Sequence, residues 1–409
     1  MKKKRIAIVA LGYAWLPGEK GPSRFYYMAN IFAESGYEVE LIGSDFQHFE
    51  KRPRDITDLN SKTYKFKNVF IHVPTYKKNI DIRRIWSNYK ASKNVLSYLR
   101  RQEKYDAIFC VIPANNVAAK VTKFCKKNGI PIVIDIEDLW PEAMKMVLNM
   151  PIVSDILYYP MMRDAEYVYS NADAVIGTSD DYTNRAFMKR EKNIPAETIY
   201  VGCDLNVFDQ GVKKYLSTIE KKEDEFWVSY AGTIGTSYDI KTLIEVANEI
   251  EKKGIKEIKF KIMGTGPLLK EMKELIKQLG NSNVELMGYM EYPIMAAYLA
   301  KTDVVVNSFV KSAPQSIVNK IGDYLASGST MINTLANLEF RRIVEENGFG
   351  INIEAENNME LMRVVLELFE DENLRKEMSI ASRKCAEEKF NRLITYKRAV
   401  KVVEALINE

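Results

Sequence analysis

The sequence is poor in the residues that build metal centres and disulfide frameworks. Among 409 residues there are two histidines, His48 and His72, and four cysteines that lie far apart and form no CxxC pair. This distribution excludes a His-rich metal site, disfavours structural zinc or a disulfide framework, and is typical of a reducing cytoplasm. A histidine general base would have to be one of the two, and His72 lies in the strand-like run 69–73.

Long apolar runs are also absent. No run approaches the roughly 18–20 apolar residues that cross a bilayer. The N-terminus has four basic residues followed by an apolar stretch from Ile6 to Leu16, which mimics a signal peptide. Because no small-residue cleavage site follows, a first buried strand is the better interpretation.

The net charge of +4 comes from 59 basic and 55 acidic side chains that are unevenly spread. Residues 1–130 hold 25 basic and 11 acidic side chains, a net of +14, and residues 131–409 carry a net of −10. A basic region of this kind suits an anionic surface or partner, and scattered surface charge is the alternative. No nucleic-acid-binding motif accompanies the charge, which disfavours nucleic acid as the partner.

The segment 82–105 is the best candidate for a basic contact surface. It has the pattern of an amphipathic helix and interleaves Trp86, Tyr89 and Tyr98 with seven basic residues. Such a face suits anionic lipid headgroups or a lipid diphosphate. In the alternative, the apolar side chains pack inward and the charges are simply solvated.

Short apolar runs alternate with amphipathic stretches, which predicts an α/β fold with parallel sheets covered on both faces. A polar, charged stretch over residues 201–225 interrupts this pattern and predicts a domain junction. We expect two Rossmann-like, doubly wound domains, residues 1–208 and 209–390, whose ligand crevice lies between the carboxyl ends of their strands. The expected strands are 6–10, 39–42, 69–73, 107–112, 132–136, 174–178, 226–230, 259–263, 284–287, 304–307 and 330–333.

Two glycine-containing turns follow strands of the expected second domain and precede helices. The first contains Gly232 and Gly235, and the second contains Gly264 and Gly266. Glycine lets backbone N–H groups approach an anionic ligand, and a helix N-terminus favours negative charge. Each turn is a weak signal alone, because glycine is common in loops between strands and helices.

The most specific segment runs from Gln315 to Gly328 and follows a strand. Asn319 and Lys320 stand where this segment enters a helix, so backbone amides and the lysine could hold a diphosphate. Asp323 lies one turn deeper and could accept a hydrogen bond from a ribose diol. The alternative is an ordinary helix on which the lysine and the aspartate are solvated.

Together these segments resemble the retaining glycosyltransferases of the GT-B fold, in the large family 4 grouping. Tyr-x-Gly-x-x-Gly occurs at Tyr230–Gly235, Gly-x-Gly-Pro at Gly264–Pro267, and Asn-Lys-x-x-Asp-Tyr-Leu-Ala-x-Gly at Asn319–Gly328. Asp138–Glu142 reads Asp-Leu-Trp-Pro-Glu, as in the bacterial branch that builds surface polysaccharide with N-acetylated or deoxy amino sugars. In this family a glycine loop after the first strand faces the donor, and Gly21 is its best match here.

The resemblance implies two facing domains, with the acceptor in the first, the nucleotide in the second, and the last helix, residues 391–409, crossing back to the first. The reaction would move a sugar, with anomeric retention, from a nucleoside-diphosphate sugar such as a UDP-hexose or a UDP-linked N-acetylated amino sugar. The acceptor would be a polyprenyl-diphosphate-linked sugar or an oligosaccharide at the inner face of the plasma membrane. The pathway would be capsule, O-antigen (lipopolysaccharide) or exopolysaccharide synthesis. No metal or other cofactor is expected, because preorganised amides and a lysine stabilise the departing diphosphate.

The resemblance also assigns site residues. The catalytic positions would be Gln315, Asp138 and Glu142. The acids at 137–142 could instead cap a helix N-terminus, and Ser179-Asp180-Asp181 is better interpreted as a cap than as a metal-binding pair. The donor-binding positions would be Gly21, Gly232, Gly235, Gly264, Gly266, Asn319, Lys320 and Asp323.

Two departures from the family pattern leave other functions open. The first acid of the family's Glu-x7-Glu pair falls on Gln315, and only Lys241 lies where many relatives place an arginine and a lysine after the glycine turn. The chain could therefore be a catalytically impaired accessory subunit that binds a partner or a glycan. A UDP-sugar epimerase of the same fold is the other alternative, although such enzymes use several acidic and histidine groups and this chain has two histidines.

Overall fold

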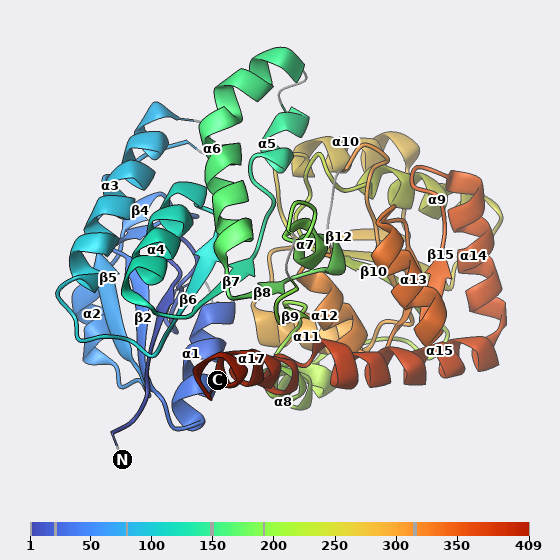
Figure 1. The fold of residues 1–409 in the computed structure, drawn as a ribbon. Helices are drawn as coiled ribbons and strands as arrows, with labels where there is room; N and C mark the ends of the chain where they lie inside the picture. The colour runs from blue at the N-terminus through green and yellow to red at the C-terminus, as the bar shows by residue number, and fades with distance from the viewer. Residues whose placement is uncertain are drawn as a thin grey trace. The chain divides into compact units, whose positions relative to one another are not determined.

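The chain folds into two α/β units, each with its own sheet and core. Unit 1 comprises Met1–Tyr200 and Leu393–Glu409, and unit 2 comprises Val201–Arg392 (Figure 1). The division lies at Tyr200 and Arg392, whereas the sequence pattern places it at residues 208 and 390. The computed structural model describes residues 2–19, 23–78, 81–147, 151–190, 193–313 and 317–408.

A seven-stranded parallel sheet forms the centre of unit 1. Its order is β5-β2-β1-β6-β7-β8-β9, so the direction of strand addition reverses between β1 and β6. Such a switch point is where doubly wound sheets bind ligands, outside the carboxyl ends of the strands. The strands are β1 (Arg5–Val9), β2 (Glu38–Ser44), β5 (Lys67–Ile71), β6 (Ala107–Ile112), β7 (Ile132–Ile136), β8 (Ala174–Gly177) and β9 (Ala196–Thr198), and β3 (Phe46–Gln47) pairs with β4 (Arg52–Pro53) separately.

Helices cover both faces of this sheet, which is why its strands are continuous apolar runs. On one face, side chains of α1 (Arg24–Glu34) and α17 (Lys397–Asn408) join the same core as Ile6 and Ile8. The C-terminal helix thus belongs to unit 1, as expected. The other face is covered by α3 (Ile82–Leu99), α4 (Asn115–Asn128) and α6 (Pro151–Asn171), and the shorter helices are α2 (Ile56–Ser61), α5 (Glu142–Val147) and α7 (Asp180–Arg185).

Unit 2 contains a six-stranded parallel sheet of order β12-β11-β10-β13-β14-β15, with its switch point between β10 and β13. The strands are β10 (Phe226–Ala231), β11 (Ile258–Met263), β12 (Val284–Gly288), β13 (Val304–Asn307), β14 (Thr330–Asn333) and β15 (Gly350–Asn352). The helices from here to the last are α8 (Leu205–Tyr215), α9 (Ile240–Lys252), α10 (Leu269–Leu279), α11 (Tyr292–Ala300), α12 (Lys320–Ala326), α13 (Leu338–Asn347), α14 (Asn358–Glu370), α15 (Glu372–Cys385) and α16 (Arg392–Thr395).

The helix α8 occupies the stretch that the sequence pattern marks as a junction. Leu205 and Phe208 are buried on one side of α8, while Lys213 and Lys214 come in its last turn. Lys213 and Lys214 are therefore on the outer face of a helix, whereas the charged run 220–225 follows the helix.

The helix α3 ends at Leu99, before the expected limit at residue 105. Tyr105 lies beyond the helix, where it is buried and its hydroxyl donates a hydrogen bond to Glu40 Oε2 at 2.5 Å. Within the described residues, no helix has the length and apolar character needed to cross a membrane.

Candidate functional site

The two glycine turns of unit 2 pack backbone against backbone at the carboxyl ends of β10 and β11. Gly232 N donates to Met263 O at 2.9 Å, and Ile234 N donates to Thr265 O at 3.0 Å. A Cβ on Gly264, whose φ is +146°, would lie 1.8 Å from Gly232 O. The close packing of the two turns leaves no room for a side chain at Gly264, even without a bound ligand. The backbone amides of both turns lie near the switch point.

Lys320 opens α12, and its amine lies in a cage of aromatic rings. The Nζ atom is 4.3 Å from the ring centres of Tyr230 and Tyr238, 4.9 Å from that of Phe309 and 5.8 Å from that of Tyr324. It is buried and has no hydrogen-bond partner among the described residues. Burial lowers the pKa of Lys320 well below its usual range.

This cage lies at the switch point of the sheet. Tyr230 belongs to β10, and Phe309 follows β13, the strand on the other side of the reversal. The Tyr324 hydroxyl joins α12 to the end of β10, because it accepts from Ala231 N at 2.8 Å and donates to Ala231 O at 2.9 Å. The amine is thus fixed where a doubly wound sheet binds its ligand.

Asp323 lies one turn after Lys320 and is also withdrawn from water. Its Oδ1 accepts a hydrogen bond from the Tyr292 hydroxyl at 2.7 Å. Burial raises the pKa of Asp323 to about 6, against the opposing effects of this hydrogen bond and of Arg392. Asn319 is exposed at the start of α12 and makes no side-chain capping hydrogen bond. The charged heads of α12 are therefore not the solvated groups of an ordinary surface helix.

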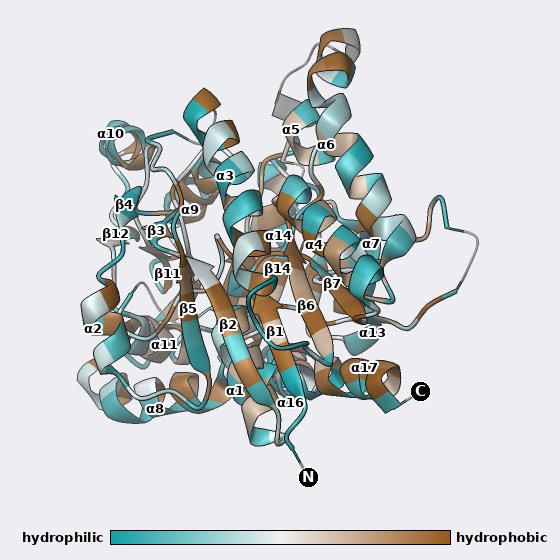
Figure 2. Cartoon of the chain, turned by 60° about the vertical axis from the view of Figure 1, so that its left-hand side comes forward, coloured by the Kyte–Doolittle hydropathy of each residue, from teal (hydrophilic) through white to brown (hydrophobic). Residues whose placement is uncertain are grey.

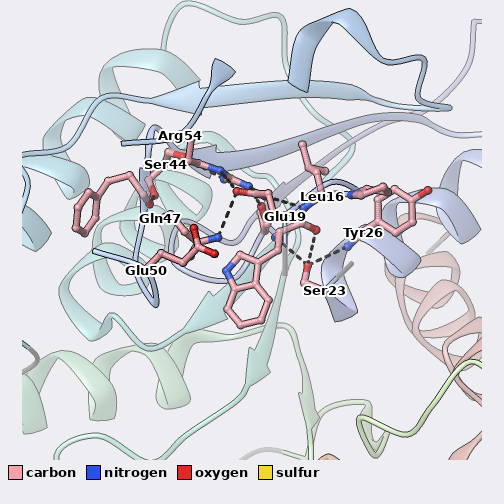
Figure 3. A network of polar contacts seen from close by, with 12 residues as sticks. Leu16, Glu19, Ser23, Tyr26, Ser44, Gln47, Glu50 and Arg54 are labelled. Atoms are coloured by element: carbon pink, nitrogen blue, oxygen red, sulfur yellow. Dashed lines mark hydrogen bonds and ion pairs between the residues drawn. The ribbon is translucent and has the colours of Figure 1, made fainter. Parts of the chain in front are cut away.

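Two of the expected site residues, Gly21 and Gln315, lie outside the described residues. The part of the loop before Gly21 is held by a buried arginine (Figure 3). Arg54 Nε donates to Glu19 Oε1 at 2.9 Å, and Arg54 Nη1 donates to Ser44 O at 3.1 Å. Glu19 Oε2 also accepts from Leu16 N at 2.9 Å, so the loop after β1 is tied to the end of β2.

Unit 1 has a pocket of its own at the carboxyl ends of β1, β2, β5, β6 and β7, with α3 as one wall. Its wall is largely aromatic, and its charged group is a guanidinium. This composition, apolar with a few convergent polar groups, is typical of small-molecule sites. The residues that give it this chemistry are Tyr13, Phe46, His48, Tyr76, Arg84 and Trp140.

Aromatic side chains contact the two polar groups of this pocket, Arg84 and His48. The Arg84 guanidinium lies 4.6 Å from the Trp140 ring centre and 6.0 Å from that of Tyr76. His48 Nδ1 contacts the Tyr76 hydroxyl, and burial, with Arg84 and Lys51 nearby, lowers the pKa of His48 to about 4. The histidine is neutral at physiological pH, and the arginine is the pocket's fixed positive charge.

The expected acids Asp138 and Glu142 have different surroundings. Asp138 Oδ2 accepts a hydrogen bond from Trp140 Nε1 at 2.9 Å, which places it behind the pocket wall, and burial raises its pKa. Glu142 Oε1 accepts from Arg185 Nε at 2.8 Å, and Arg185 also binds Glu166 at 2.6 Å. Asp138 thus adjoins the pocket, whereas Glu142 is part of an ion-pair network.

A buried ionic cluster lies directly before Asp138. Arg24 Nε lies 3.0 Å from Asp135 Oδ2 and 3.1 Å from Glu137 Oε1, and its N–H points to Asp135. Glu137 Oε1 therefore accepts no hydrogen bond. Burial raises the pKa of Glu137 to about 8, with Arg24 opposing and Asp135 reinforcing the shift. The cluster fixes the end of β7 and contains a carboxyl group that titrates near neutral pH.

The acids that follow β8 are at a helix start. Ser179 caps α7 by accepting a hydrogen bond from Tyr182 N at 3.3 Å, and Asp180 and Asp181 occupy the first turn. Across the ranges that the structure describes, no group of three or more His, Cys, Asp or Glu side chains could hold a metal ion.

Comparisons with known proteins find likenesses in both sequence and fold. Both units are doubly wound parallel-sheet units, as in the GT-B fold. Residues 213–385 match the model for glycosyl transferases group 1. HepE of Anabaena, solved in complex with UDP, has a similar fold with a TM-score of 0.70 at 14% identity, over 98% of this chain and 100% of that one. WaaG, a glycosyltransferase involved in lipopolysaccharide biosynthesis, gives a TM-score of 0.66 at 13% identity, over 97% of this chain and 99% of that one.

Two curated proteins are similar over most of the chain. An uncharacterized glycosyltransferase of Methanocaldococcus jannaschii is 24% identical over 347 residues, which are 82% of this chain and 87% of that protein. The other is from Campylobacter jejuni, and it is named as an α-1,4-N-acetyl-D-galactosaminyltransferase acting on a diphosphoundecaprenol-linked saccharide. It is 22% identical over 305 residues, 71% of this chain and 80% of that protein. These likenesses support a glycosyltransferase of the GT-B fold.

Replacement of Gly266 by alanine should destabilise unit 2, whereas replacement of Gly235 should not. A Cβ at Gly266 would lie 2.2 Å from Ile234 O, whereas one at Gly235 would lie 3.4 Å from its nearest neighbour, a Thr233 methyl carbon. We expect Gly266→Ala to lower the free energy of unfolding by roughly 2–4 kcal/mol and Gly235→Ala to change it by less than about 0.5 kcal/mol. Urea unfolding followed by fluorescence of the buried Trp227 measures both, and equal effects would contradict this packing.

Glu137 should make unit 1 less stable as the pH rises. Its pKa is raised from 4.5 to about 8 in the folded state, so the folded state binds the proton more tightly than the unfolded state does. The stabilisation is complete below the unfolded pKa and is lost as the pH rises toward 8. The isosteric variant Glu137→Gln should gain roughly 2–4 kcal/mol on the wild type between about pH 5 and pH 8. A stability difference that does not vary with pH in urea unfolding would refute the assignment.

Proposed function

We propose that the protein is a retaining glycosyltransferase of the family 4 grouping that takes its sugar from a nucleoside-diphosphate donor. The observation that carries this proposal is the buried, unpartnered amine of Lys320 at the switch point of unit 2. It lies within residues 213–385, the segment that matches the glycosyltransferase model. A diphosphate supplies the negative charge and the acceptor oxygens that this amine lacks.

The proposed donor is a UDP-hexose or a UDP-linked N-acetylated amino sugar. HepE is described in complex with UDP and with UDP-glucose, and the Campylobacter relative is named as an N-acetylgalactosaminyltransferase. In this chain the donor would lie over the turns that contain Gly232, Gly235, Gly264 and Gly266. Asn319 and Asp323 would contact the nucleotide, and Gly21 is proposed as a further donor-binding residue.

In the proposed reaction, the bond between the anomeric carbon and the diphosphate oxygen breaks, and the acceptor oxygen bonds to the same face of that carbon. The acceptor proton passes to the departing phosphate. The group that needs stabilisation is the diphosphate, whose charge grows as the bond breaks. A lysine amine in a water-excluded site stabilises that charge without a metal. Gln315 would contact the transferred sugar through its amide, and Asp138 and Glu142 would shape the acceptor side.

The pocket of unit 1 is the proposed acceptor site. Its aromatic wall suits a sugar ring, and Arg84 suits an anionic group carried next to that ring. The acceptor we propose is a polyprenyl-diphosphate-linked sugar or an oligosaccharide, and the pathway is capsule, O-antigen or exopolysaccharide synthesis. With such an acceptor the enzyme would work in the cytoplasm at the inner face of the plasma membrane, through its basic first 130 residues.

Product analysis separates this enzyme from its two rivals. Incubation with a panel of UDP-sugars and a lipid-linked acceptor should give a lengthened saccharide with the α or β configuration of the donor retained. Binding without turnover would instead identify an impaired accessory subunit, for which Gln315 is the motivating residue. A C2-epimerised sugar from UDP-N-acetylglucosamine alone would identify an epimerase.

The variant Lys320→Met should bind UDP about 10–100-fold more weakly than the wild type, because it removes a charge-assisted contact and keeps the side-chain length. Isothermal titration calorimetry measures this affinity. Because burial depresses the lysine pKa and a diphosphate raises it, wild-type binding should also take up protons wherever the pH lies between the free and the bound pKa, seen in a pH series as a dependence on buffer ionisation enthalpy.

Lys270→Met is the matched control. Lys270 is highly exposed on α10, 3.9 Å from Glu274, and its replacement should leave both the UDP affinity and the proton uptake unchanged. If Lys320→Met binds UDP as well as Lys270→Met does, the donor site is elsewhere.

A further inference from the structure

Large apolar side chains are exposed on two helices of unit 1. Of sixteen such side chains in the described residues, eight belong to α3 and α6. Two helices therefore carry half of the exposed large apolar side chains in the part of the chain that the structure describes, and this clustering is typical of an interaction site. The eight are Ile82, Ile85, Trp86, Tyr89, Val153, Ile156, Leu157 and Tyr159.

The two helices present these side chains at one edge of the unit. In a parallel sheet the helices run against the strands, so the N-terminal ends of α3 and α6 both lie at the carboxyl edge. All eight side chains belong to the N-terminal halves of these helices, and α4 packs against both helices. Figure 2 shows hydrophobic segments toward the free ends of both helices.

The N-terminal end of α6 exposes mostly apolar side chains. Ile156 is 73% exposed and Leu157 60% exposed, and Val153 and Tyr159 flank them. One side chain in this stretch, Ser154, is buried. A helix packed on a protein core shows one apolar stripe, whereas this end exposes apolar side chains on more than one side. Its one charged side chain, Asp155, is exposed and pairs with Lys145 Nζ at 2.5 Å. We call residues 153–159 the α6 apex.

The exposed surface of α3, which α4 separates from α6, combines aromatic rings with lysines. Trp86 and Tyr89 are stacked with their ring centres 5.5 Å apart. Lys90 lies 4.8 Å from the Trp86 ring centre, and Lys93 and Lys120 lie 4.6 and 5.0 Å from that of Tyr89. Neither α3 nor α4 contains an acidic residue. Tryptophan, tyrosine and lysine in this combination are typical of the headgroup level of a bilayer.

We propose that this edge of unit 1 docks on an anionic lipid bilayer, with the α6 apex inserted at the boundary of the acyl chains and the α3 lysines among the headgroups. The positive charge of α3 and α4 selects anionic lipid, and the aliphatic apex supplies the insertion. This rests on the proposed function in one respect: the unit 1 pocket, which Arg84 of α3 lines, would receive its lipid-linked acceptor from the docked surface.

Co-sedimentation of the full chain with vesicles tests the proposal. Phosphatidylcholine vesicles with about one third phosphatidylglycerol should bind the protein, and pure phosphatidylcholine vesicles should bind it much less. The double variant Ile156→Ser, Leu157→Ser should lose about tenfold or more in vesicle affinity. Lys90→Gln with Lys93→Gln should weaken binding and reduce its dependence on salt.

A matched control removes equally exposed apolar side chains from unit 2. Leu338 is 82% exposed and Met359 79% exposed, and Leu338→Ser with Met359→Ser should bind vesicles like the wild type. Brominated lipids should quench Trp86, and this quenching should disappear in Trp86→Phe. Because the substituted side chains are exposed or, for Lys90, half-buried, the variants should keep the wild-type unfolding temperature.

Three results would overturn the inference. The apex variant could bind vesicles as tightly as the wild type. Brominated lipids could leave Trp86 unquenched. Light scattering could show a wild-type dimer that the apex variant dissociates, which would make a second copy of the chain the occupant. UDP calorimetry on the same preparation separates the two proposals, because a protein that binds UDP but no vesicles contradicts only the docking surface.

Discussion

A buried ammonium group without a counter-charge is expensive, and the site in unit 2 is arranged around one. Removal of a charge from water costs several kcal/mol, and aromatic rings return only about 2 kcal/mol or somewhat more. At Lys320, which lies beside β10 and β13 and the two glycine turns, this cost lowers the pKa of the amine. A diphosphate bound at that point would offset the cost, because it would supply the negative counter-charge that the ammonium form of Lys320 lacks.

The unit 1 pocket, like the Lys320 site, lies at the switch point of its sheet. Each sheet reverses its order beside its first strand, between β1 and β6 and between β10 and β13, and each carries the side chains of its candidate site at the carboxyl edge. In unit 2 this edge holds an amine in an aromatic cage, and in unit 1 it holds a guanidinium against Trp140. In unit 1 the buried ion pair between Arg24 and Asp135 holds the end of β7 in place. The charged group differs between the two units, but in both units it lies against aromatic rings at the carboxyl edge of the sheet.

Much of the fold could be predicted from the sequence, because buried parallel strands are short β-branched runs between helices. Ile132–Ile136 and Val304–Asn307 have the same limits in the sequence pattern and in the structure. The helix α8 was missed because its apolar stripe is short and its charges dominate a linear reading. Residues 82–105 were assigned to one helix, although Tyr105 leaves it to bury its ring beside Glu40.

The site was predictable only where one segment carries the signal. The spacing within one segment predicts Lys320 and Asp323 as site residues. The cage around Lys320 could not be predicted, because Tyr230, Tyr238 and Phe309 are distant from it in sequence. Likewise, the pocket around His48 and Arg84 draws on five strand ends. For Glu142 the sequence motif predicts a catalytic position, but the structure shows its carboxylate in an ion pair with Arg185. The places of Gly21 and Gln315 in the site stay predictions.

The most direct test of this account is the titration of the Lys320 amine itself. Nuclear magnetic resonance of protein labelled at lysine side chains, assigned with Lys320→Met, follows this group with and without UDP. The account predicts a pKa well below the usual lysine range in the free protein and a marked rise when UDP binds. An ordinary lysine pKa that UDP leaves unchanged would contradict it.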